Sequence, residues 1–186
     1  MRFKLKGLLF GVLLLPLLFP FALSAQQFAY VANGDSNSVS VIDTSSNTVV
    51  ATVAVGFEPF GVAITPDGTR AYVTNVGSSS FSVIDTSSNT VVATAAVGSP
   101  PEGVAITPDG TRAYVTNPFS DSFSVIDTSS NTVVATSAVG FQPVGVAITP
   151  DGTRAYVANS GPASVSVIDT SNNAVVATVT VGSSPV

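Results

Sequence analysis

The stretch TPDGTRAYVTN occupies residues 65–75 and recurs unchanged at residues 107–117. It returns at residues 149–159 with one change, Ala158 in place of threonine. Within it, the Pro-Asp-Gly run has the composition of a tight turn, and the Ala-Tyr-Val-Thr run that follows is typical of a strand. The chain therefore repeats a turn and a strand as one unit.

The period of this repetition is constant along the chain. Four copies of Ala-Tyr-Val recur at equal intervals without a gap, with their tyrosines at Tyr30, Tyr72, Tyr114 and Tyr156. A fixed period of about 40 residues indicates a repeat architecture, in which each unit buries its apolar face only by stacking on a neighbour. The sequence predicts repeats at residues 29–70, 71–112 and 113–154, with a partial repeat at 155–186.

Each repeat contains four valine-rich segments that alternate partly between apolar and polar residues. They are represented by AYVTN at 71–75, SVSVID at 38–43, TVVATVAVG at 48–56 and GVAIT at 61–65. Gly, Pro, Asp, Ser and Asn separate them, as expected for short strands joined by turns. The predicted fold class is all-β: a β-propeller built of 42-residue blade units, each with four short antiparallel strands, the last unit being incomplete. A flat β-solenoid is the structural alternative.

Three linked motifs carry a resemblance to a known family. The chain repeats AYVTN, then SVIDTSSNTVVAT, then VAITPDGTR, and it does so from Ala29 to the end of the chain. This set resembles the YVTN-type β-propeller repeat of bacterial and archaeal surface-layer and exported proteins. The resemblance implies a propeller blade, but it says little about activity, because propellers host many unrelated functions.

Recurring acidic residues at the turns have a structural and a chemical interpretation. Asp67 follows Pro66 and precedes Gly68, which suits the positive-φ position of a turn. Asp67 and Arg70 could instead form an ion pair, but a carboxylate that bonds the turn backbone is the better interpretation. The aspartates of the VIDT motif are likewise interpreted as turn-forming, namely Asp43, Asp85, Asp127 and Asp169.

The strand count predicts an open ring. The repeats supply fifteen strands, whereas four full blades need sixteen. Open ends of a propeller would expose apolar sheet faces, which are a liability or an interface. We expect self-association into a homodimer, for instance an eight-blade ring, or a longer propeller context. A strained four-blade closure with one three-stranded blade is the alternative.

The N-terminal segment, residues 1–25, has the pattern of a secretory signal peptide. Arg2, Lys4 and Lys6 precede an apolar run at residues 7–23, and Ala25 offers a cleavage site. An uncleaved anchor is the alternative, and it would be the protein's only tie to a membrane. The predicted location is secreted, at the cell surface or in the periplasm.

Composition excludes several classes of function. Beyond residue 25, eleven carboxylates face three arginines, a formal charge of −8, which argues against a nucleic-acid partner. The chain has no histidine or cysteine, and no lysine follows residue 25. These absences remove Ser-His-Asp triads, thiol nucleophiles, Schiff bases and nearly all zinc sites. No cofactor is implied, and no residue is singled out as a metal ligand or catalytic group.

Differences between copies gather in two loops. Residues 71–112 and 113–154 agree at 35 of 42 positions, and six of the seven differences fall in the loop after AYVTN or the loop before GVAIT. In an up-and-down blade both loops leave the same end of the sheet, so one face is variable. The candidate binding face comprises Asp35, Asn37, Phe57, Glu58, Phe60, Glu102, Phe119, Asp121, Phe141 and Gln142.

Aromatic rings beside carboxylates suit a carbohydrate, a peptide or a calcium ion. The alternative is drift in exposed loops that packing does not constrain. We expect an exported, non-catalytic module that binds a ligand or has a structural role at the cell surface or in the periplasm. One alternative is a hydrolase, either lactonase-like or dependent on a carboxylate pair such as Glu58 and Glu102. A truncated propeller without independent function is the other.

Overall fold

The computed structural model describes residues 27–186, and the predicted signal peptide lies outside this range. The described chain is all-β, as predicted, and only three short 3-10 turns interrupt its strands. Within residues 27–186, no helix has the length and apolar character needed to cross a membrane. The strands are β1 (Phe28–Asn33), β2 (Ser38–Asp43), β3 (Thr48–Ala54), β4 (Pro59–Ile64), β5 (Arg70–Asn75), β6 (Ser80–Asp85), β7 (Thr90–Ala96), β8 (Val104–Ile106), β9 (Arg112–Asn117), β10 (Ser122–Asp127), β11 (Thr132–Ala138), β12 (Pro143–Ile148), β13 (Arg154–Asn159), β14 (Ser164–Asp169) and β15 (Ala174–Thr180).

These strands form four antiparallel sheets, each a meander in chain order. The first sheet has three strands, β1 to β3, and the other three have four strands each: β4 to β7, β8 to β11, and β12 to β15. Each four-stranded sheet begins one strand earlier than the sequence repeat, whereas the first sheet lacks this strand. The incomplete unit, which is the last repeat in the sequence, is therefore the first sheet in space.

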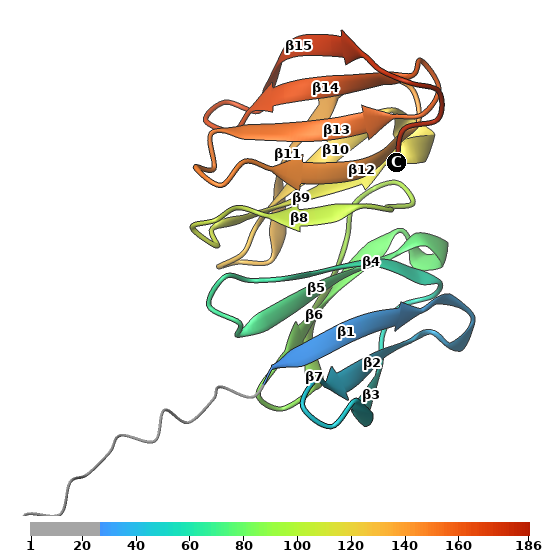
Figure 1. Cartoon of the computed structure of the whole chain (residues 1–186), viewed down its shortest axis with the longest axis vertical. Helices are drawn as coiled ribbons and strands as arrows, with labels where there is room; N and C mark the ends of the chain where they lie inside the picture. The colour runs from blue at the N-terminus through green and yellow to red at the C-terminus, as the bar shows by residue number, and fades with distance from the viewer. Residues whose placement is uncertain (1–26) are drawn as a thin grey trace, which may run out of the picture.

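The sheets stack face to face in chain order (Figure 1). The first strand of each sheet lies beside the first strand of the next sheet: β1 contacts β4, β4 contacts β8, and β8 contacts β12. Three clusters of buried side chains fill the three junctions between neighbouring sheets. The first and last sheets lie at opposite ends of the stack (Figure 1).

A tyrosine and an alanine-valine pair from the next sheet form the repeating contact at each junction. Tyr72 is 1% exposed and packs in one cluster with Ala113 and Val115 of the following sheet. Its hydroxyl donates a 2.6 Å hydrogen bond to Asn131 Oδ1, in the turn between β10 and β11. Burial raises the pKa of Tyr72 to about 12, so the hydroxyl remains a donor throughout the neutral range.

The same contact recurs at the third junction, and in part at the first. Tyr114 donates a 2.6 Å hydrogen bond to Asn173 Oδ1, again 59 residues later in the chain. At the first junction the equivalent atoms are the Tyr30 hydroxyl and Asn89 Oδ1. Both are buried there without a hydrogen-bond partner. The first junction therefore has the packing but lacks the tyrosine-to-asparagine bond.

The Pro-Asp-Gly turns have the predicted geometry. Gly68 has φ of 72°, in the left-handed region that glycine adopts without a steric cost, and its N–H donates to the Thr65 carbonyl at 2.7 Å. The turns after the VIDT motif are also tight, with an asparagine such as Asn131 at positive φ. Asparagine tolerates this region better than most residues, which explains its recurrence in all four copies.

Candidate functional site

The variable loops lie together at one end of the stack, which we call the variable end. It consists of the turns after β1, β5, β9 and β13 and the connections from each sheet to the next. At the first junction, the Val76 N–H donates to the Glu58 carbonyl at 2.9 Å, and the Gly77 N–H to the Phe57 carbonyl at 3.0 Å. This connection is therefore bonded to the turn of the sheet that follows it.

In two of the three connections, a side chain of the preceding sheet accepts a further hydrogen bond from the connection. The Glu58 N–H donates to Asn37 Oδ1 at 2.9 Å, and the Gln142 N–H donates to Asp121 Oδ1 at 3.0 Å. Glu58 and Gln142 both have positive φ, 51° and 53°. A long side chain in this region is uncommon, and the bond from the neighbouring turn holds it there.

The middle connection differs because proline occupies the equivalent position. Pro100 stands one full repeat after Glu58 and one full repeat before Gln142. The proline ring fixes φ at about −65°, so the left-handed conformation is not accessible to it. Gly98 has φ of 85° instead, and the middle connection follows another path.

Eight of the ten candidate residues therefore fall into two equivalent sets, which lie two repeats apart. The first junction has Asp35, Asn37, Phe57 and Glu58, and the third has Phe119, Asp121, Phe141 and Gln142. Residues of the first set line a hollow of about 450 Å³, together with Gly34 and Gly77. The phenylalanines of both sets are more than half exposed. Sequence comparison of adjacent copies missed this pairing, which appears when copies two repeats apart are aligned.

The structure does not bring the other two candidates into this hollow. Phe60 is exposed at the start of β4. Glu102 is partly buried in the middle connection, where its carbonyl accepts a 2.6 Å hydrogen bond from the Thr74 hydroxyl. Burial raises the pKa of the Glu102 carboxyl above its usual value. Glu58 lines the hollow and Glu102 does not, so the hollow holds no carboxylate pair formed by these two residues.

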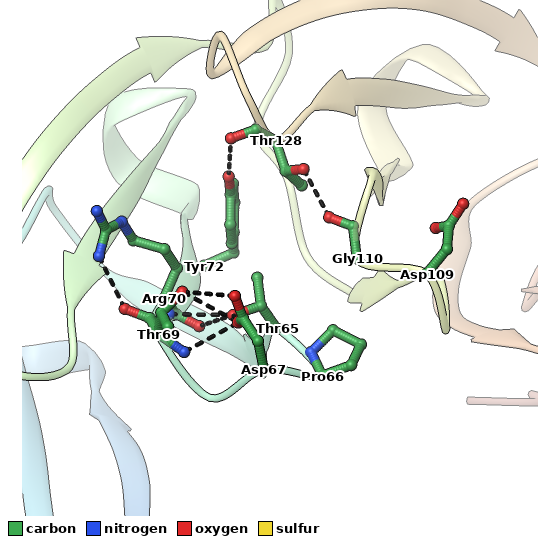
Figure 2. A pocket seen from close by; sticks show the side chains of 9 residues that line it. All are labelled: Thr65, Pro66, Asp67, Thr69, Arg70, Tyr72, Asp109, Gly110 and Thr128. Atoms are coloured by element: carbon green, nitrogen blue, oxygen red, sulfur yellow. Dashed lines mark hydrogen bonds between the residues drawn. The ribbon is translucent and has the colours of Figure 1, made fainter.

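The opposite end carries the invariant turns and has hollows of its own. Figure 2 shows one of about 440 Å³, between the turn that contains Asp67 and the residues Gly110 and Thr128 of the next sheet. The Asp67 carboxylate lies over its own turn, where Oδ1 accepts bonds from the Thr65 hydroxyl at 2.6 Å and the Thr69 N–H at 3.0 Å. Asp67 therefore forms the turn, as predicted.

The arginines make an ion pair that sequence reasoning did not predict. Arg70 pairs with Asp85 at 2.5 Å, and the equivalent pairs are Arg112–Asp127 and Arg154–Asp169. Arg70 lies directly opposite Asp85 in the register of β5 and β6. The other oxygen of Asp85 accepts bonds from the Ser87 N–H and hydroxyl, so the turn-forming role holds as well. The available signal was the constant separation of the two partners in the sequence, which is the same in all three pairs.

The lowered pKa values of these aspartates predict a loss of folding stability in acid. The Ser129 hydroxyl, backbone N–H groups and Arg112 lower the pKa of Asp127 to about 2, and similar bonds lower that of Asp85 to about 2. Because an unfolded aspartate titrates near about 3.9, the stabilisation is complete above that pH and is lost as the pH falls toward about 2. We expect a constant urea midpoint from pH 7 to 5 and a falling one from pH 4 to 2.

An Asp127→Asn variant provides the control for this titration. Asparagine keeps an oxygen acceptor for the turn, but it cannot ionise and does not pair with Arg112. The variant is expected to be less stable than the parent at pH 7 and to lose less stability between pH 4 and 2. An equal acid dependence in parent and variant would show that other groups cause it.

Comparisons with known proteins support the fold. No protein-family model and no curated protein matches the chain. Among solved structures, hydrazine synthase of Kuenenia stuttgartiensis, a propeller-type protein, matches 82% of this chain with a TM-score of 0.78 and 32% sequence identity. The chain has a β-propeller-type fold. The match covers 45% of the hydrazine synthase chain, so this propeller-type chain spans less than half the length of that protein.

Proposed function

We propose that the chain is an exported, non-catalytic propeller module of the YVTN type that binds a ligand through its variable end. The observation that carries the proposal is the pair of equivalent loop sets at the first and third junctions. Each set presents an exposed phenylalanine, Phe57 or Phe141, beside a polar residue held at positive φ. Exposed aromatic rings with adjacent hydrogen-bonding groups are a common form of recognition surface.

The chemistry of the two sets favours binding over turnover. Among residues 27–186, no group of three or more histidine, cysteine, aspartate or glutamate side chains is placed to hold a metal ion. The third set has Gln142 where the first has Glu58, so the two sets share no titratable group at this position. What they share is a ring and a hydrogen-bonding side chain, a combination suited to a carbohydrate or peptide ligand.

A binding screen with matched variants tests the proposal. The labelled chain is applied to glycan and peptide arrays, and hits are titrated by calorimetry. We expect two ligands per chain, reduced to one by either Phe57→Ala or Phe141→Ala. The double variant should bind at least about tenfold more weakly, since truncation of an interface hot spot costs about 2 kcal/mol or more and about 1.4 kcal/mol is tenfold in affinity. Val134→Ala, on the exposed side of β11, should change nothing.

Two outcomes would contradict this function. Binding that is unaffected by the double variant would place the ligand elsewhere on the molecule. Chemical conversion of a bound lactone or glycoside, lost in a Glu58→Gln or Glu102→Gln variant, would make the chain a hydrolase. The export component is tested separately by the N-terminus of the protein recovered from cells, which should be Gln26.

A further inference from the structure

In each of the other sheets, one face carries a tyrosine that packs against the next sheet. In the last sheet the equivalent face is exposed. In β13, Ala155 and Val157 are buried against the preceding sheet, whereas Tyr156 points the other way and is 42% exposed. The equivalent residues Tyr72 and Tyr114 are each 1% exposed, because a following sheet covers them. Tyr156 is thus the unpaired tyrosine of the series.

The first sheet exposes the complementary face. In β1, Ala29 and Val31 point away from the second sheet, and Val31 is 44% exposed. The equivalent alanine and valine of β9, Ala113 and Val115, are fully buried under Tyr72 of the preceding sheet. One end of the stack therefore exposes a tyrosine with no alanine-valine pair against it. The other end exposes an alanine-valine pair with no tyrosine against it.

We infer that the tyrosine face of β13 to β15 docks on the Ala29 and Val31 face of a second copy of this chain. The internal junctions define the geometry of this contact. In it, the Tyr156 hydroxyl of one copy donates to Asn47 of the second, as Tyr72 donates to Asn131 and Tyr114 to Asn173. Asn47 is exposed and has φ of 53°, close to the values of its three equivalents.

Two further observations favour a second copy as the occupant. The carbonyl carbon of Val186 lies 2.9 Å from the position of a methyl group on Gly145, so Val186 takes the place against the last sheet that Val144 takes against Gly103 one repeat earlier. Neither β1 nor β15 contains a charged residue. These two strands therefore add no charge to the contact, although the chain as a whole is acidic.

The contact is head to tail, and such contacts form a ring where the rotation between copies closes and an open filament where it does not. We expect closure by two copies, each using both faces, in a ring of eight sheets. This inference concerns the ends of the stack, and it does not rest on the proposed binding role of the variable end. It would still hold if no ligand were found there.

A complementation experiment tests the contact. Tyr156→Arg and Val31→Glu each place a charge on one of the two faces, and native mass spectrometry reports the assembly. We expect the parent to be a dimer and each variant alone to be a monomer. An equimolar mixture of the two variants should again form a dimer, because one contact is intact and the other pairs opposite charges. Val92→Arg, on the exposed side of β7, is the matched control and should remain a dimer.

Other results would overturn the inference. A monomeric parent, or a parent dimer that either variant leaves intact, would show that these faces do not meet. Circular dichroism must show folded sheets in each variant. Crosslinking is a second measurement. The chain contains no cysteine, so Tyr156→Cys and Asn47→Cys can be introduced into separate copies and joined by a short bis-maleimide. Absence of this crosslink in a mixture, or its equal formation with Val92→Cys, would also contradict the contact.

Discussion

Replacement of Tyr114 by alanine is expected to lower the free energy of unfolding by about 3–5 kcal/mol, the range for large aromatic side chains removed from a core. The ring is fully buried, stacks on Phe123 at 5.7 Å between centroids, and fills the junction between the third and fourth sheets. Urea unfolding followed by circular dichroism measures the loss. Val134→Ala should change stability by less than about 0.5 kcal/mol, since Val134 is exposed.

The hydrogen-bond part of this contact can be separated from its packing. Asn173→Ala removes the 2.6 Å acceptor of the buried Tyr114 hydroxyl, leaves it only the Thr170 carbonyl at 3.5 Å, and should cost about 1–3 kcal/mol. Tyr114→Phe removes the donor, so the double variant should lose less than the sum of the two single variants. Additive losses would mean that the bond does not couple the third and fourth sheets.

Replacement of Gly103 by alanine is the second large effect we expect. A methyl group on Gly103, the residue before β8, would lie 2.4 Å from the carbonyl oxygen of Val144 in β12. The carbonyl belongs to the backbone and the methyl group has no rotamer that avoids it, so two sheets must move apart to relieve the clash. Overpacking of this kind typically costs about 1–3 kcal/mol. The loss is measured by urea unfolding.

Gly182→Ala is the control for this substitution. A methyl group at Gly182 meets no atom within 4 Å, and its φ is not positive. It should therefore leave stability nearly unchanged. If Gly103→Ala also left stability unchanged, the close approach of β8 and β12 would not be a constraint on the fold.

The local parts of the fold could be predicted from the sequence because they depend on neighbouring residues. The turn at Gly68 and the strand that contains Tyr72 are specified by short motifs, and their repetition fixed the period of the architecture. The pairing of Arg70 with Asp85 was not predicted. It depends on the register between two strands, which composition does not specify.

The candidate site was predicted in part. The alternation of loops in an up-and-down sheet placed the variable residues at one end, and the hydrogen bonds of Glu58 and Gln142 place these two residues there. The division into two equivalent sets was not predicted, because it depends on a backbone conformation that Pro100 forbids and Glu58 adopts. Whether this end binds a ligand stays a prediction.

The central claim is that one repeating contact joins the sheets within a chain and that the same contact joins two chains, through Tyr156 of one and Val31 of the other. The solution mass of the protein tests this claim most directly. Light scattering after size exclusion would be compared with the mass of the denatured chain. The account predicts twice the denatured mass for the parent protein. A folded species of single mass at all concentrations tested would contradict it, because Tyr156 and Val31 would then remain uncovered.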